Sequence, residues 1–297
     1  MGAVTAKLKE KGVIQPPPFL LDNIHYETMM GSHAYAVNNS DSDVDIYGFC
    51  IPPKEIIFPH LGGDIVGFGL QKKRFEQFQA HAAVDPDTGV DYDITIYSIV
   101  KYFHLCMLNN PNMIDSLFTS RRCVLHATKV ANIVKENRKL FLHKGSWHRF
   151  KNYAYSQINQ IRTKNPKGKR KQLVEQFGYD VKYAYHLVRL MCEVEQILLE
   201  HDIDLERNRE QLKSIRRGEW TKEDVFDWFS KKEKILEEIY VKSDLREEAE
   251  EDAIKQLLMD CLEEHYGSLD GVIVTPSKSG KILDDLEGLL HKHRMYE

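Results

Sequence analysis

The most informative stretch of the sequence runs Met30-Gly-Ser-His-Ala-Tyr-Ala-Val-Asn-Asn-Ser-Asp-Ser-Asp-Val-Asp-Ile46. Asp43 and Asp45 stand two positions apart at the start of an apolar segment that ends near Ile51 and is typical of a strand. Because successive side chains of a strand point to opposite faces, both carboxylates project from one face and can converge on divalent cations. A polar turn is the alternative explanation for such a pair on its own.

Two features around this pair complete a candidate site for phosphoryl transfer. Hard oxygen ligands suit Mg²⁺ or Mn²⁺, and two such ions stabilise the attacking and the leaving oxygen of a phosphoryl displacement. A third carboxylate is expected from the strand-like segment 90–97, where Asp91 and Asp93 occupy alternating positions. Upstream, Gly31-Ser32 precedes a short helical segment, whose backbone donors, with the Ser32 hydroxyl, can hold a nucleotide phosphate.

The chain as a whole indicates an α+β protein in two parts. Before residue 123, short segments rich in β-branched and aromatic residues predict strands, with a helix at 98–108 that stops at Asn109-Asn110-Pro111. After it, apolar residues recur with the helical period. The helices are expected at about 126–142, 146–163, 172–201, 221–241 and 246–266. We therefore expect a catalytic domain of mixed sheet and helices at 1–122 and a helical domain at 123–297 with an exposed basic loop at 163–171.

Composition excludes several classes of protein. Of 297 residues, 42% are hydrophobic and 29% are charged, and the mean hydropathy is −0.46, which argues against disorder and against a membrane-embedded chain. The N-terminus lacks the apolar core of a signal peptide, so we expect a cytoplasmic protein. The five cysteines are too widely spaced for a redox pair or a zinc knuckle, and reduced thiols are expected.

Charge is distributed unevenly along the chain. The net charge of −4 divides into −6 for residues 1–120, +12 for 121–181 and −10 for 182–297. A local positive excess of this size attracts phosphate-bearing ligands even when the whole protein is acidic. A solvated helical face is the alternative interpretation.

The motifs together resemble a known family. Gly31-Ser32 followed by Asp43-Val44-Asp45 is similar to the signature of the DNA polymerase beta-like nucleotidyltransferase superfamily. The residues of the motifs are even more similar to those of the predicted nucleotidyltransferases of the YcgL type. This branch includes proteins encoded beside RNA ligases and RNA-repair enzymes. The resemblance extends from residue 24 to about residue 217. It is carried by Gly-Ser-His-Ala-Tyr with Ser-Asp-Ser-Asp-Val-Asp-Ile-Tyr-Gly, by Asn110-Pro111-Asn112 with Leu117-Phe118, and by Gly178-Tyr179-Asp180 with Lys182, Ala184, His186, Leu187, Arg189 and Leu190.

The resemblance implies a polymerase beta-like catalytic domain with a nucleotidyl transfer site. In that site Asp43, Asp45 and Asp93 are the catalytic, metal-binding carboxylates, and Gly31 and Ser32 contact the triphosphate. Asp93 is preferred to Asp91 because it directly precedes an apolar run, and the choice between them stays open. One departure is visible, because relatives commonly have glycine where this sequence has Ala36.

A second cluster lies on the helix expected after residue 172. Lys182, His186 and Arg189 fall at positions i, i+4 and i+7 and share one helical face. Lysine suits phosphate as a point charge, arginine as a bidentate clamp and histidine as a hydrogen-bond donor, so we predict that these three bind the nucleotide. The alternative is a structural polar network in which Asp180 caps the helix.

These observations predict a metal-dependent nucleotidyltransferase that uses Mg²⁺ or Mn²⁺. A nucleoside triphosphate such as ATP gives its nucleotidyl group to an acceptor hydroxyl and releases pyrophosphate. RNA is the expected acceptor, as a tRNA or an RNA 3′ end, because of the basic segment and the association of similar proteins with RNA repair. The residues predicted to bind RNA are Lys167, Lys169, Arg170 and Lys171. Alternatives are a protein or small-molecule acceptor, or a nucleotide- or RNA-binding module without catalysis.

Overall fold

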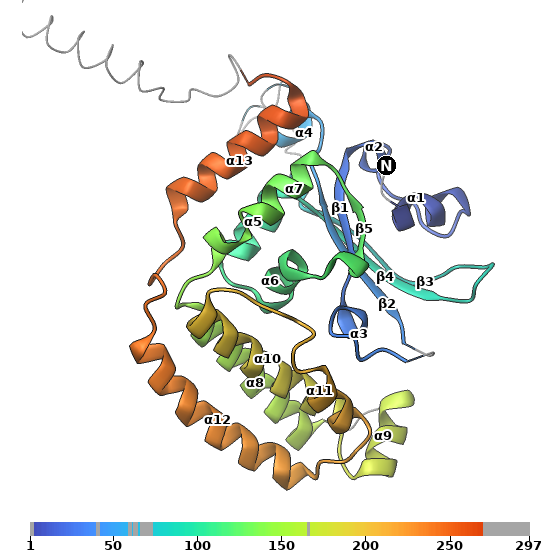
Figure 1. Ribbon diagram of the computed structural model, residues 1–297. Helices are drawn as coiled ribbons and strands as arrows, with labels where there is room; N and C mark the ends of the chain where they lie inside the picture. Colours follow the sequence, from blue (N-terminus) through green and yellow to red (C-terminus); the bar gives the residue numbers. More distant parts are fainter. Residues whose placement is uncertain are drawn as a thin grey trace, which may run out of the picture.

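The computed structural model describes residues 3–39, 42–58, 61, 65, 74–164 and 167–269. Its framework is a five-stranded mixed sheet in the order β3-β4-β2-β1-β5, with helices on both faces (Figure 1). The α+β class predicted from the sequence is therefore confirmed. The strands are β1 (Ile24–Met29), β2 (Val44–Cys50), β3 (Gln77–Val84), β4 (Asp91–Ser98) and β5 (Val124–Ala127).

The central strand β2 pairs in parallel with β4 and antiparallel with β1. The outer strands are antiparallel to their neighbours, β3 to β4 and β5 to β1. In the parallel register Asp45 lies opposite Asp93 and Ile46 opposite Ile94. Since residues opposite one another point to the same face, β2 and β4 share one aliphatic face and one face that carries the acidic residues.

The aliphatic face packs against the N-terminal part of the chain. Ile46 and Ile94 are fully buried there together with Leu8 of helix α1 (Ala3–Glu10). The buried carboxylate of Glu27 on β1 accepts hydrogen bonds from backbone amides of the first turn of α1. Glu27 thus supplies the acceptor that a helix start requires, because α1 has no acidic residue in its own first turn.

The other face carries most of the helices and the larger core. Helix α10 lies at the centre of this layer, buried on almost every side against α8, α11 and α12. The helices after α1 are α2 (Leu20–Asn23), α3 (Gly31–Ala34), α4 (Lys54–Ile57), α5 (Ile99–Met107), α6 (Pro111–Phe118), α7 (Lys129–Glu136), α8 (Ser146–Thr163), α9 (Lys169–Phe177), α10 (Val181–Glu200), α11 (Arg209–Arg216), α12 (Lys222–Lys242) and α13 (Glu251–Tyr266), with 3₁₀ turns at Arg121–Cys123 and Arg138–Phe141.

Several predictions in the helical part were wrong in detail. The helix expected at about 126–142 is only α7, because β5 precedes it and it ends at Glu136 before a 3₁₀ turn. α5 ends at Met107, and Pro111, expected only as part of a helix stop, begins α6, because the missing N–H of proline costs nothing at the first position of a helix. The single helix expected at 172–201 is interrupted at Gly178, which has a φ of +80° and ends α9. The basic loop expected at 163–171 is shorter, because α8 continues to Thr163 and α9 already begins at Lys169.

The sheet and the helical layer share one continuous core. Strand β5 and helix α7, both beyond the boundary predicted after residue 122, belong to the sheet and to its covering layer. Near the end of the described chain, α13 returns to pack on α5 and α7. Within the described residues, no helix is long and apolar enough to cross a membrane. All five cysteines are buried and unpaired.

Candidate active site

The acidic residues of β2 and β4 lie at the ends where both strands begin. Asp45 and Asp93 are directly opposite one another on the face that looks toward α10, and Asp43 precedes Asp45 by two residues. Asp43 is exposed, whereas Asp45 and Asp93 are partly buried. The parallel register thus places two of the three carboxylates that the sequence singled out side by side, and Asp43 lies directly before β2.

The electrostatic state of Asp45 shows how close these charges are. Burial, followed by the neighbouring charges of Asp93 and Asp43, raises the pKa of Asp45 to about 6, while the ammonium group of Lys182 acts in the opposite direction. A carboxylate that is disfavoured by two neighbouring carboxylates is stabilised when a cation binds among them. The physical chemistry of the cluster therefore favours a cationic ligand.

Asp93 already has partners on the edge strand β3. One of its carboxylate oxygens accepts a hydrogen bond of 3.0 Å from the amide of Ala82 and lies 3.4 Å from Nδ1 of His81. The amide is presented by a β-bulge, in which the register shifts between Ala80 and Ala83 and Ala82 has a φ of +50°. Asp91 is the other candidate third carboxylate, and one of its oxygens is buried without a hydrogen-bond partner among the described residues.

The donor set fits divalent cations in its chemistry and its register. Hard carboxylates are the ligands that Mg²⁺ and Mn²⁺ prefer, and here two lie on neighbouring strands and the third directly before β2. In the described part of the chain, however, no three acidic, histidine or cysteine side chains are drawn together tightly enough to hold an ion. Binding one ion at all three carboxylates therefore requires that their side chains move closer together.

Gly31 brings the backbone of α3 against the same cluster. Gly31 has a φ of +55°, and a Cβ atom at this position would lie 1.9 Å from Oδ2 of Asp45. The neighbouring amide of Met30 donates a hydrogen bond of 2.7 Å to the carbonyl oxygen of Asp45. Only glycine allows this approach, so the turn that carries Ser32 lies directly beside the Asp45 carboxylate.

Positive charges face the carboxylates from the helical layer. Burial and the nearby charges of Arg170 and Arg216 lower the pKa of Lys182, and Asp43 partly opposes this effect. Burial, Arg170, Lys182 and Arg216 together lower the pKa of His186 to about 3. Lys182 therefore brings a charge close to Asp43 and Asp45, and His186 is a neutral hydrogen-bonding group at physiological pH.

Arg170 and Arg216 are each fixed by specific contacts. Arg170 donates a hydrogen bond of 3.1 Å to Asp180, and its guanidinium lies 4.3 Å from the ring centroid of Tyr183. Arg216 donates a hydrogen bond of 2.6 Å to the carbonyl oxygen of Val37, just after α3. No helix was predicted over 209–216, so no pattern in the sequence placed Arg216 near the acidic cluster.

Arg189, the third residue of the helical face predicted to bind the nucleotide, lies in the core. Arg189 is only 3% exposed, and its guanidinium donates a hydrogen bond of 2.8 Å to the fully buried Asp115 of α6. It also lies 4.5 Å from the ring centroid of Tyr35. The helical face that Lys182, His186 and Arg189 share thus runs from a partly exposed end into the core, and Arg189 is at the core end.

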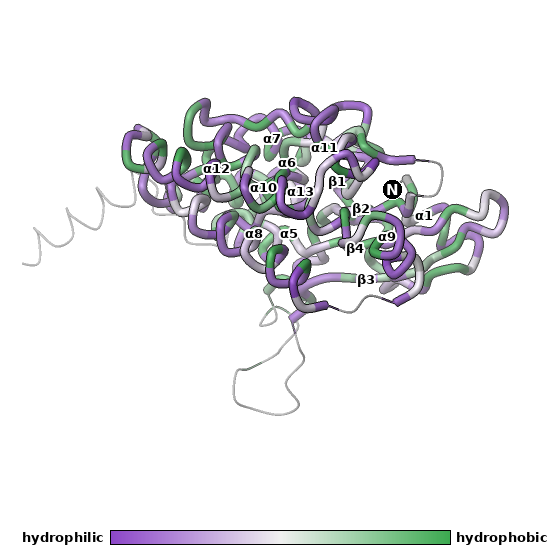
Figure 2. Tube along the Cα trace, turned by 90° about the horizontal axis from the view of Figure 1, so that it is seen from below, coloured by the Kyte–Doolittle hydropathy of each residue, from purple (hydrophilic) through white to green (hydrophobic). Residues whose placement is uncertain are grey.

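The residues predicted to bind RNA lie around the start of α9. Lys167 and Lys171 are exposed, and Lys171 is 3.5 Å from Glu175 on the next turn. Arg170 is partly buried by its pairing with Asp180, while the side chain of Lys169 lies outside the described part. Most of α9 is hydrophilic (Figure 2), which fits a helix that rests on the surface.

Comparison with known proteins places the chain in a family. The sequence profile of the RlaP family, described as "RNA repair pathway DNA polymerase beta family", matches residues 5–260. No curated protein matches the chain. Among solved structures, the nucleotidyltransferase-like protein from Exiguobacterium sibiricum is 8% identical, with a TM-score of 0.28, and the match covers 87% of this chain and 74% of that one.

Proposed function

Because the chain belongs to the RNA repair pathway DNA polymerase beta family, we propose that it transfers a nucleotidyl group from a nucleoside triphosphate to a hydroxyl group of RNA. The observation that carries this proposal is the placement of Asp45 opposite Asp93, with Asp43 two residues earlier and Lys182 facing them. Such a site has the charges that both the metal ions and the triphosphate of this reaction require.

Each part of the site has a role in the proposed reaction. Asp43, Asp45 and Asp93 would hold Mg²⁺ or Mn²⁺, which supplies charge stabilisation at the attacking and leaving oxygens. Gly31 and Ser32 bind the triphosphate from the side of the sheet. Lys182 and His186 bind it from the helical side, one as a charge and the other as a neutral hydrogen-bonding group.

Bond formation and cleavage then occur at the α-phosphorus. The acceptor hydroxyl oxygen attacks it in line, and the bond to the bridging oxygen of the β-phosphate breaks, so that pyrophosphate leaves. Asp93 orients the hydroxyl and accepts its proton. The exposed carboxylate oxygens of Asp93 suit this task, because its side chain is 46% exposed while Asp45 is largely enclosed.

RNA is the acceptor that best matches the rest of the molecule. The family description refers to RNA repair, and Lys167, Lys169, Arg170 and Lys171 stand close in sequence to the helix that carries Lys182. The salt bridge between Arg170 and Asp180 connects this basic segment to the start of α10. A bound RNA end would thus lie near both the basic segment and the acidic cluster.

The proposal is tested by label transfer from each of the four α-³²P-labelled nucleoside triphosphates to total RNA and total protein, with Mg²⁺ or Mn²⁺. The Asp43→Asn/Asp45→Asn double variant should lose all transfer, and Asp22→Asn, an exposed carboxylate on α2, should keep it. Because ionised Asp45 is disfavoured in the fold, we expect the double variant to melt no lower than the wild type. Label on protein alone would replace the RNA acceptor with a protein hydroxyl, and label on neither would argue for a binding module.

A further inference from the structure

A buried polar cluster lies directly behind the turn that begins with Gly31 and Ser32. The hydroxyl of Tyr35 donates a hydrogen bond of 2.6 Å to Oδ2 of Asp115, and Arg189 donates one of 2.8 Å to the same oxygen. The guanidinium of Arg189 also lies against the ring of Tyr35. All three residues are at most 3% exposed. This cluster therefore cannot reach a ligand, and its contacts fix Tyr35 in two directions.

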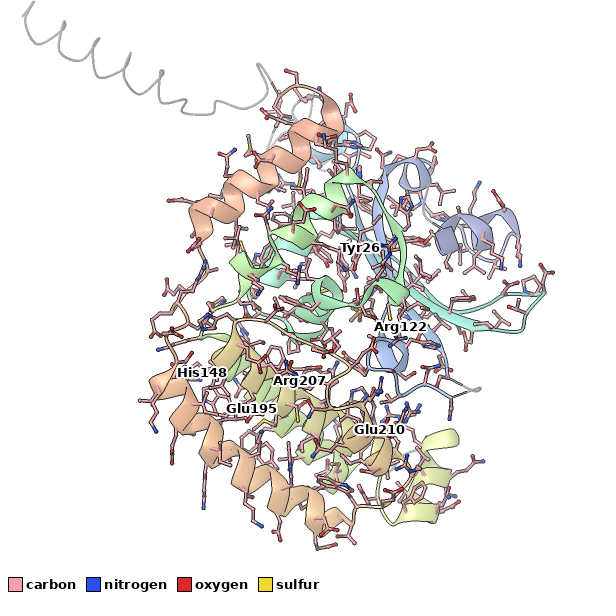
Figure 3. The ribbon with its side chains drawn as sticks, in the orientation of Figure 1. Tyr26, Arg122, His148, Glu195, Arg207 and Glu210 are labelled. Carbon is pink, nitrogen blue, oxygen red and sulfur yellow. The ribbon has the colours of Figure 1, made fainter. Side chains whose placement is uncertain are left out.

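Tyr35 directly follows α3 as its capping residue, so its position sets the position of the turn. Two other arginines hold the same segment by its backbone. Arg122, seen beside α3 in Figure 3, donates a hydrogen bond of 2.8 Å to the carbonyl oxygen of His33, and Arg216 donates one to that of Val37. The segment is thus held at His33 by the 3₁₀ turn before β5, at Tyr35 by α6 and α10, and at Val37 by α11.

The cluster is not needed to fill the core. Burying a guanidinium with carboxylates costs desolvation energy, and apolar residues of similar volume generally serve stability as well. Moreover, the second oxygen of Asp115 and both oxygens of the buried Glu193 have no hydrogen-bond partner among the described residues. The cluster therefore contributes more than stability. Its directional hydrogen bonds fix the orientation of the turn, which apolar packing does not do.

We propose that Arg189 is a positioning residue, which acts with Asp115 to hold Tyr35 and thereby sets the Gly31–Ser32 turn in the geometry that receives a triphosphate. The role of the turn in binding a triphosphate rests on the proposed function, whereas the contacts that hold the turn do not depend on it. The positioning role replaces the direct phosphate contact predicted for Arg189. The turn must keep its place within a fraction of an ångström, because Gly31 already touches the carboxylate of Asp45.

The test compares Tyr35→Phe with Tyr102→Phe. Both substitutions remove a buried hydroxyl that has a hydrogen bond of 2.6 Å, but Tyr102 bonds to Ser116 and does not contact the turn. We expect similar losses of melting temperature in the two variants. Only Tyr35→Phe should speed hydrogen–deuterium exchange at the amides of Ala36 and Val37, and only it should weaken Mg²⁺–ATP binding, by roughly tenfold.

Arg189 itself is tested by rescue. Arg189→Lys keeps a cation beside Asp115, whereas Arg189→Met does not. We expect the two variants to have equal melting temperatures, but Arg189→Lys should retain more nucleotide affinity. Equal exchange in the Tyr35→Phe and Tyr102→Phe variants would overturn the positioning role. If wild-type protein bound no nucleotide, the proposed function would fail, whereas the exchange measurement would still decide whether the cluster holds the turn.

Discussion

The backbone around α3 shows how a single residue can control the site. Gly31 and Ala36 both have left-handed φ angles, +55° and +53°, and Ala36 adopts this conformation at some cost because it carries a Cβ atom. The departure noted in the sequence therefore leaves the turn in place. Gly31 has no such freedom to change, because its missing side chain makes room for Asp45.

The first prediction is that Gly31→Ala lowers the free energy of unfolding by more than the strain of its left-handed backbone alone explains. Gly89, in the β3–β4 turn, has a similar φ of +69°, but no described atom lies within 4 Å of the place that its Cβ would take. Gly89→Ala therefore measures the backbone cost alone, roughly 1 to 2 kcal/mol. Gly31→Ala must also displace the Asp45 carboxylate. We expect a larger loss of unfolding free energy in urea, together with loss of Mg²⁺–ATP binding. Equal losses in the two variants would contradict the close packing of Gly31 on Asp45.

The second prediction concerns Glu193, which lies fully buried beside Arg189. Burial raises the pKa of Glu193 from 4.5 to about 7, so the folded protein binds a proton there that the unfolded chain releases. The stability that this bound proton contributes is fully present below the pKa that Glu193 has in the unfolded chain, and it is lost as the pH rises toward 7. Glu193→Gln should therefore stabilise the protein near pH 8, by no more than about 3 kcal/mol, and have little effect near pH 4.

Thermal unfolding at several pH values measures this difference. Glu238→Gln on α12, whose side chain is 75% exposed, serves as the control and should show no such pH dependence. A constant difference between Glu193→Gln and wild type at every pH would mean that folding does not raise the pKa of Glu193.

At the scale of single elements, Asp180 connects the stability of α10 to the position of Arg170. One of its oxygens accepts the backbone amide of Lys182 and caps the helix, as the alternative interpretation of this residue predicted, while the other accepts Arg170. Asp180→Ala removes both contacts and should cost roughly 1 kcal/mol in urea unfolding. Asp180→Asn keeps the cap and should cost clearly less. Equal losses would show that the ion pair, not the cap, holds the start of α10.

Periodicity and turn residues predicted those elements whose apolar pattern is long and regular. The strands that carry the acidic residues and helices α5, α8, α12 and α13 were found in this way, with ends that differ by a few residues. Helix α11 was missed because only Leu212 and Ile215 of its eight residues are buried. A short helix with two core contacts gives too weak a pattern against its charged background.

The candidate site was predictable to the extent that it depends on local spacing. A two-residue alternation places Asp43 and Asp45 on one face in any strand, and Asp93 required only the further assumption that the two strands are neighbours. The burial of Arg189 was not predictable, because helical spacing gives the face on which it lies but not what covers that face. The partners of Arg189, Tyr35 and Asp115, come from segments 74 or more residues away, and this pairing is a property of tertiary packing.

At the scale of the whole molecule, the uneven charge predicts how RNA binding depends on salt. An RNA that contacts the basic segment releases bound counterions, so its affinity should fall steeply as salt is added. Lys167→Gln/Lys171→Gln should reduce the slope of log K against log salt by about 1.4, whereas Lys231→Gln/Lys234→Gln, exposed lysines of α12, should leave it unchanged. Fluorescence anisotropy of a labelled RNA measures this slope. An unchanged slope in the first variant would exclude the start of α9 from the RNA-binding surface.

The return of α13 to the sheet layer has a consequence for the way in which the protein is made. His265 bonds to His25 of β1 across 240 positions of the chain, and α13 covers apolar residues of α5 and α7. When the strands that carry the acidic residues leave the ribosome, α13 has not yet been synthesised or still lies in the exit tunnel. The nascent chain therefore presents an uncovered apolar layer until α13 is available, and we expect it to need chaperone protection until α13 emerges.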